Sequence, residues 1–232
     1  MKRSLLGGCH VRRRRNRQST RGLPKCQSSA ANLLVGLFFA LGFQLSPARA
    51  ASEIGSSWLA AIEASRTLKD SLFRQGEGSP LRPEDVPSFA GLVYFPADST
   101  WRIDGELHRY GRTREIPLPD TGGTTIAVER FGRFVFRRDG KPFWLEVFRS
   151  LQGGALTVYF TDETNGTSTY GAGRYAAVSQ LENSTYVIDF NSAYNPYCAY
   201  NEDYICPLPP AQNYLPFEVA AGEMNVGPDL DH

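Results

Sequence analysis

Apolar and polar residues alternate along most of the chain from about residue 100 onward, the pattern typical of half-buried β-strands. Asp139 and Gly140 predict a tight hairpin turn within this part, because Gly readily adopts the positive φ that such a turn needs. Many short strands in series predict a mainly β fold, an antiparallel barrel or sandwich. The segments enriched in β-branched and aromatic residues are 100–110, 124–131, 133–138, 142–149, 155–160, 169–175, 185–190 and 214–220.

One helix is predicted in front of the strands, at residues 56–75. A serine can cap its start, and the stretch 76–80, rich in Gly and Pro, ends it. Arg66 and Asp70 are four residues apart, a spacing that could let them pair on the exposed face of the helix. The apolar residues that fall roughly on one side are Trp58, Leu59, Ile62, Leu68, Leu72 and Phe73.

The first 50 residues have the features of a cleaved export signal. They contain ten Lys or Arg residues and no acidic ones, an apolar run at 33–45, and small residues at Ala48 and Ala50 before a cut after Ala50. The apolar run is shorter than the roughly 20 residues that span a bilayer. We therefore expect a periplasmic or secreted protein without a stable membrane anchor after cleavage. Because the basic region is long, an organellar transit peptide in front of a lumenal signal stays an alternative, as does an uncleaved anchor.

Cleavage at that point would divide the chain into a signal (1–50), a helix with its linker (51–80), a β domain (81–224) and a flexible tail (225–232). Loss of ten of the 25 basic residues leaves 15 against 24 acidic ones, a net charge of −9. This balance argues against nucleic acid as a partner, since phosphates require a basic protein face. The oligomeric state is not indicated by any of these patterns.

The segment 190–216 has the most unusual composition of the chain. It holds five of the eleven tyrosines, five of the fifteen prolines and two of the four cysteines. Proline restricts the backbone, and asparagine stabilises turns. We therefore predict a proline-braced loop that covers one end or face of the sheet, and we expect any site to lie in or against it.

Cys198 and Cys206 are the only cysteines left after cleavage. An isolated even pair in an oxidising compartment predicts a disulfide. Its ring of about nine residues would contribute roughly 2.6 kcal/mol. A redox-active or nucleophilic cysteine and a metal-binding pair are the alternatives, but the spacing is not that of a C-x-x-C motif and a second ligand pair is absent. We expect no metal and no cofactor.

Several residues in and near this loop are candidates for ligand binding. Tyrosine rings and asparagine amides can recognise polar groups or sugar rings, and an arginine can hold an anion or pair with an acid such as Asp189. Each residue also has a structural interpretation, because asparagine caps turns and tyrosine rings seal loops onto sheets. The candidates are Arg174, Asn191, Tyr194, Asn195, Tyr200, Asn201 and Asn213.

Two blocks of this loop, 190–201 and 206–216, carry the pattern F-N-x-A-Y-N-P-x-C-A-Y-N followed by C-P-L-P-P-x-x-N-x-L-P. With the stretches 89–96 and 170–175, they resemble the signature of an uncharacterised family, domain of unknown function 1684. The resemblance extends over about residues 65–223. It implies a mostly β domain and no established activity. At Gln212 the family usually has Glu, which counts against a mechanism centred there. The resemblance also implies that some members of the family lack an export signal. In those members the cysteine pair could not depend on an oxidising compartment to form a disulfide.

Three functions follow as hypotheses. The leading one is a non-catalytic module that binds a small polar or saccharide-like ligand at the 190–216 loop. One alternative is a hydrolase that uses a carboxylate such as Asp189 as a base, with the loop as its lid. Another is a structural envelope protein. The spacing of the carboxylates picks out no catalytic pair, so the sequence leaves open whether the protein is an enzyme.

Overall fold

The computed structural model describes residues 47–75, 78–181 and 185–225. Most of the predicted signal and of the predicted tail lies outside these residues. The single α-helix of the described part, α1 (Pro47–Arg74), begins nine residues before the predicted start and runs across the predicted cleavage position. No described helix is long and apolar enough to cross a membrane.

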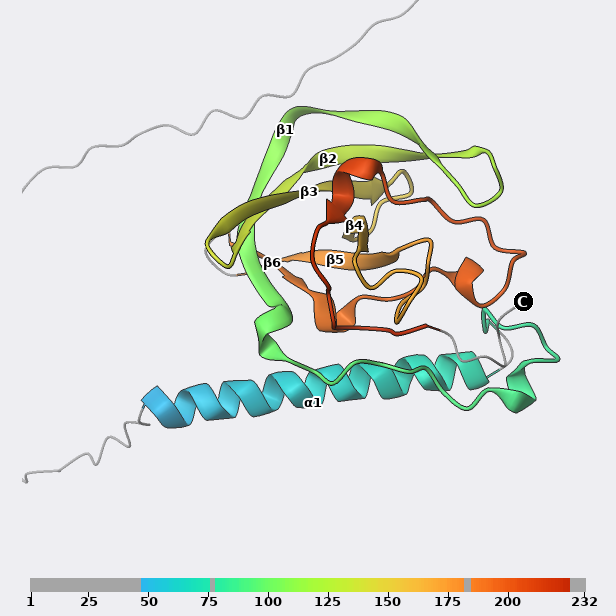
Figure 1. Ribbon diagram of the computed structural model, residues 1–232, viewed down its shortest axis with the longest axis horizontal. Helices are drawn as coiled ribbons and strands as arrows, with labels where there is room; N and C mark the ends of the chain where they lie inside the picture. Colours follow the sequence, from blue (N-terminus) through green and yellow to red (C-terminus); the bar gives the residue numbers. More distant parts are fainter. Residues whose placement is uncertain (1–46, 76–77, 182–184, 226–232) are drawn as a thin grey trace, which may run out of the picture. The chain divides into compact units, whose positions relative to one another are not determined.

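Six antiparallel strands form a closed barrel, which confirms the mainly β fold and selects the barrel over the sandwich (Figure 1). The strand order is β3-β2-β1-β6-β5-β4, and β3 returns to β4 through the pair Phe148 and Thr157. A seventh strand, β7 (Tyr214–Leu215), runs parallel to β4. The barrel strands are β1 (Arg102–Pro119), β2 (Thr125–Arg138), β3 (Lys141–Ser150), β4 (Leu156–Asp162), β5 (Arg174–Gln180) and β6 (Tyr186–Asp189).

The Asp-Gly hairpin is confirmed between β2 and β3. Asp139 and Gly140 have φ values of 49° and 76°, the left-handed conformation that suits a tight turn. The predicted strands at 124–131 and 133–138 are one continuous strand, with a register irregularity against β3 between Arg130 and Gly132. Such an irregularity bends a long strand, which helps the sheet to close.

Two of the predicted strands are misplaced. The segment 169–175 turns before β5 begins at Arg174, because Gly173 has a φ of 98° and a Cβ there would lie 2.6 Å from the carbonyl oxygen of Phe160. The segment 214–220 is a strand only over β7. Beyond it, the carbonyls of Val219 and Ala221 accept hydrogen bonds from the Arg174 guanidinium instead of joining a sheet.

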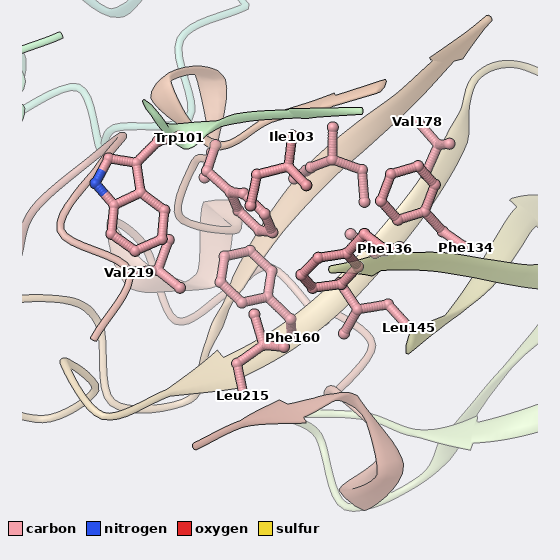
Figure 2. Close-up of a cluster of buried hydrophobic side chains, with 14 of the residues drawn as sticks. Trp101, Ile103, Phe134, Phe136, Leu145, Phe160, Val178, Leu215 and Val219 are labelled. Atoms are coloured by element: carbon pink, nitrogen blue, oxygen red, sulfur yellow. The ribbon is translucent and has the colours of Figure 1, made fainter. Parts of the chain in front are cut away.

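The main core fills the barrel with aromatic and branched side chains, among them Trp101, Phe134, Phe136 and Phe160 (Figure 2). A second cluster joins α1 to the segment before the barrel and to the 190–216 loop. Phe73 of α1 packs there with Phe89 and Tyr200, at ring-centroid distances of 5.5 Å and 4.9 Å. This contact holds the second half of α1 against the 190–216 loop. Beside it lies a pocket lined by residues of both segments.

Candidate functional site

A pocket of about 620 Å³ lies between α1 and the first part of the 190–216 loop. One wall comes from α1, the opposite wall from the loop, and single residues complete it from the segment before the barrel, from β5 and from the end of the described chain. Its lining combines two cations, one carboxylate and several tyrosine rings with aliphatic side chains. The residues that contribute most are Arg66, Lys69, Tyr94, Tyr194, Tyr197, Tyr204, Ile205 and Glu223.

The two cations of α1 differ in their pairing. The ammonium of Lys69 forms an ion pair with Glu223 and lies 4.9 Å from the ring centroid of Tyr194. Arg66 packs its guanidinium over the Tyr94 ring at 4.5 Å and donates one hydrogen bond of 3.3 Å to the carbonyl of Asn191. Neither of these Arg66 contacts neutralises its charge. The predicted pairing of Arg66 with Asp70 is wrong, because Asp70 pairs with Arg74 at 3.5 Å.

Glu223 is the buried centre of the pocket floor. Its carboxylate accepts hydrogen bonds from the backbone N–H of Asn195 at 2.8 Å and from the Tyr200 hydroxyl at 2.7 Å, in addition to its pairing with Lys69. These contacts tie α1, the loop and the chain end together. Burial raises the pKa of Tyr200, and the nearby Glu223 carboxylate raises it further. The Tyr200 hydroxyl therefore stays protonated and able to donate a hydrogen bond.

Three tyrosines of the loop line the pocket. Tyr194 is partly buried, and burial raises its pKa to about 12, so it is a neutral hydrogen-bond donor at neutral pH. Tyr197 and Tyr204 pack edge to face at 5.3 Å and are partly exposed. Within the described residues, these three hydroxyls have no hydrogen-bond partner. The three side chains are therefore candidates to contact a ligand in the pocket.

The structure brings two of the seven candidate residues, Asn191 and Tyr194, to the pocket. The Asn191 side chain is occupied by the protein: its amide contacts the backbone of Asp98 in both directions at 2.8 Å. Asn195 and Tyr200 lie behind the lining, bonded to Glu223 and to each other. Tyr194 is thus the one candidate that lines the pocket and whose side-chain polar group has no hydrogen-bond partner among the described residues.

The other three candidates lie elsewhere. Arg174 is fully buried and forms an ion pair with Asp162 at 2.8 Å. Its acidic partner is therefore Asp162 and not Asp189, which the sequence suggested. Asn213 is fully buried against the barrel, and its side chain bonds the backbone of two strands. The Asn201 side chain accepts a hydrogen bond from the backbone of Asp203, the turn role that asparagine commonly has.

Asp189, the suggested base of a hydrolase, is engaged on both carboxylate oxygens. Oδ2 accepts a hydrogen bond of 2.7 Å from the Trp58 indole of α1, and Oδ1 accepts from the backbone and side chain of Asn191. Asp189 does not line the pocket. The carboxylate therefore fastens the helix and the loop to β6 instead of facing a substrate.

The predicted disulfide is not formed in this structure, where Cys198 and Cys206 are free cysteines. They are nevertheless neighbours, since the backbone N–H of Cys198 lies 3.4 Å from the Cys206 sulfur. A hydrogen bond from the Cys206 thiol lowers the pKa of Cys198 to about 7, and the same contact raises that of Cys206. Among the residues that the structure describes, no group of three or more His, Cys, Asp or Glu is arranged to hold a metal.

This pairing predicts which thiol reacts first. A lowered pKa makes Cys198 a thiolate above about pH 7, so its alkylation by iodoacetamide under reducing conditions is expected to rise through about pH 7. Cys206→Ala removes the donor and should move this inflection towards about pH 8.5, the value of an unperturbed thiol. Mass spectrometry of the labelled peptide over a pH series measures both. An inflection near 8.5 in the unaltered protein would contradict the assignment.

Sequence reasoning missed the cations and the carboxylate of the pocket. Arg66 and Lys69 lie three residues apart on α1, in line with Trp58, Ile62 and Phe73 on the face that meets the barrel. The sequence signal for them is that two basic residues interrupt a row of residues that otherwise packs against the barrel. The spacing of apolar residues alone predicts a different buried face, one that includes Leu59 and Leu68. Both of these side chains are exposed.

Fold and site together define a small six-stranded barrel with one docked helix and a pocket between them. The model of the family described as "Protein of unknown function (DUF1684)" matches residues 87–224, and the chain belongs to this family. A solution NMR structure of an uncharacterized protein from Haloarcula marismortui is similar, with 32% sequence identity and a TM-score of 0.60. That alignment covers 78% of this chain and 99% of the archaeal one. No curated protein matches the chain.

Proposed function

We propose that this protein is a binding module for a small ligand that carries polar groups on a ring-shaped or apolar body, held in the pocket between α1 and the 190–216 loop. The observation that carries the proposal is the pocket itself. Its volume of about 620 Å³ is within the range of roughly 300–1,000 Å³ typical of small-molecule sites. Its lining has the mixture such sites use, apolar and aromatic walls with a few polar groups.

The arrangement supports binding in preference to catalysis. Glu223 is committed to Lys69, Asn195 and Tyr200, and Asp189 lies outside the pocket lining with both oxygens engaged. The groups available to a ligand are tyrosine rings and hydroxyls and the Arg66 guanidinium, which recognise and orient a molecule. Export to the periplasm or beyond remains part of the proposal, resting on the leader pattern of the first 50 residues.

The test uses two fluorescent probes, phenylnaphthylamine and its sulfonated form anilinonaphthalene sulfonate, whose emission rises in an apolar site. At least one is expected to bind with a saturable curve. Tyr194→Ala should weaken that binding by about tenfold, since an aromatic contact in a desolvated site contributes about 1.4 kcal/mol. Fluorescence titration of the purified protein gives the dissociation constants.

The matched control is Tyr214→Ala, which removes an exposed tyrosine of β7 outside the pocket. It should leave probe affinity unchanged. Absence of saturable binding of both probes, or equal losses in the two tyrosine variants, would refute the assignment of a ligand site to this pocket. Near-UV circular dichroism of each variant verifies that the barrel is intact.

A further inference from the structure

We propose that the ligand of this pocket is a monoanion, a carboxylate or another singly charged oxyanion on a ring-shaped body, and that Arg66 is the residue that binds its charged group. The inference rests on the proposed function and names the chemical class of the ligand. Three observations lead to it: the charge count of the lining, the unpaired state of Arg66 and the fixed position of its guanidinium.

The charge count leaves one positive charge without a partner. The charged residues of the lining are Arg66, Lys69 and Glu223. Lys69 and Glu223 neutralise each other through their ion pair. The pocket therefore has a net charge of +1, located on Arg66, and an electrically matched ligand contributes a single negative charge.

The acids around Arg66 do not supply that charge. Within the described residues, no carboxylate lies within 4.0 Å of its guanidinium, while Glu63, Asp189 and Glu223 act on it from farther away. Glu63 is exposed on α1, and the other two are held by the contacts described above. Arg66 keeps a buried Nε without a hydrogen-bond partner. A partly buried cation in this state is electrostatically costly, and an incoming anion offsets the cost.

The guanidinium is also held ready for a ligand. Stacking on Tyr94 at 4.5 Å and the bond to the Asn191 carbonyl fix its plane at the pocket wall. Four of its five N–H donors have no partner recorded among the described residues. A planar, pre-oriented fork suits a carboxylate better than a mobile ammonium does, and little side-chain entropy remains to be lost on binding.

The rest of the lining describes the uncharged part of the ligand. Tyr194, Tyr197 and Tyr204 offer ring faces and hydroxyls, and Leu72 and Ile205 add apolar surface. These groups surround a body that is flat or apolar with one or two hydroxyl or carbonyl groups. A doubly charged phosphate monoester fits this site less well, because its second charge has no cation once Lys69 is paired with Glu223.

The experiment compares the two probes of the previous section, which differ only in the sulfonate. We expect anilinonaphthalene sulfonate to bind about tenfold more tightly than phenylnaphthylamine, the effect of one charge-assisted hydrogen-bonded contact. Arg66→Gln should abolish that preference, because it should weaken binding of the sulfonated probe about tenfold more than binding of the neutral probe. Arg66→Lys should retain part of it. Arg74→Gln is the matched control, since Arg74 lies on the same helix, pairs with Asp70 and does not line the pocket.

A competition arm with naphthoate and naphthyl phosphate tests the number of charges. Naphthoate should displace the bound probe at the lower concentration. Stronger displacement by naphthyl phosphate would overturn the monoanion assignment. Equal affinity for the charged and neutral probes, or the same loss in Arg66→Gln for both, would overturn the role of Arg66 while leaving the pocket as a ligand site. Failure of both probes to bind would instead refute the proposed function itself.

Discussion

Replacement of Arg174 by Met is expected to lower the free energy of unfolding by about 3–5 kcal/mol, because it leaves the Asp162 carboxylate buried without its counter-charge. The guanidinium and Asp162 are both fully buried at a distance of 2.8 Å. The same guanidinium donates to the carbonyls of Val219 and Ala221 at 2.8 Å and 2.5 Å. Urea unfolding followed by tryptophan fluorescence measures the loss.

The comparison variant is Arg149→Met, which removes an arginine paired with Glu129 at 2.6 Å on the barrel surface. Its side chain is 39% exposed, and exposed pairs contribute at most about 1 kcal/mol. Both variants remove one positive charge, so the difference between their losses of unfolding free energy measures the effect of burying the ion pair. Equal losses of stability would show that the buried ion pair between Arg174 and Asp162 stabilises the fold no more than an exposed pair does.

Asn213→Ala is the second change for which we expect a large effect, a loss of about 2–4 kcal/mol in the free energy of unfolding. The fully buried side chain accepts from the backbone N–H of Glu146 at 2.7 Å and donates to the carbonyls of Glu146 and Tyr159 at 3.0 Å and 2.8 Å. Alanine would leave three buried backbone groups unpaired, each at a cost of about 1–3 kcal/mol, partly relieved by water or relaxation.

Asn201→Ala is the matched control, because its side chain makes one exposed bond, with the backbone of Asp203 at 3.0 Å. It should change stability by less than about 1 kcal/mol. Thermal denaturation of both variants under identical conditions provides the comparison. A Tm for Asn213→Ala within the error of the Asn201→Ala value would mean that the barrel does not depend on this crosslink.

Much of the fold could be predicted because it follows from local chemistry. The strands β2 and β3 and the Asp139-Gly140 turn between them follow from neighbouring residues, and the structure confirms them. The structure of the segment after β7 was harder to predict. The segment after Leu215 has the composition of a strand, but its carbonyls bind Arg174, a partner more than 40 residues away in the sequence. Only the closed barrel brings the two together.

The sequence indicates one wall of the candidate pocket but hardly the composition of its lining. The loop after residue 190 does form one wall of the pocket, yet most of its asparagines satisfy backbone groups, as Asn191 and Asn195 do. The charge of the pocket comes from α1, where Arg66 sits on the face that docks on the barrel. The sequence offers no local sign that a helix 125 residues away from Asn191 will face it.

The family match begins at residue 87, whereas α1 ends at Arg74. The barrel and the aromatic wall of the pocket therefore lie inside the region that defines the family, and the cationic wall lies outside it. In the proposed function, scaffold and charge selectivity are therefore carried by separate parts of the chain. If the pocket binds an anion as proposed, a change confined to one helical face would convert its preference to neutral molecules or cations without altering any residue of the barrel.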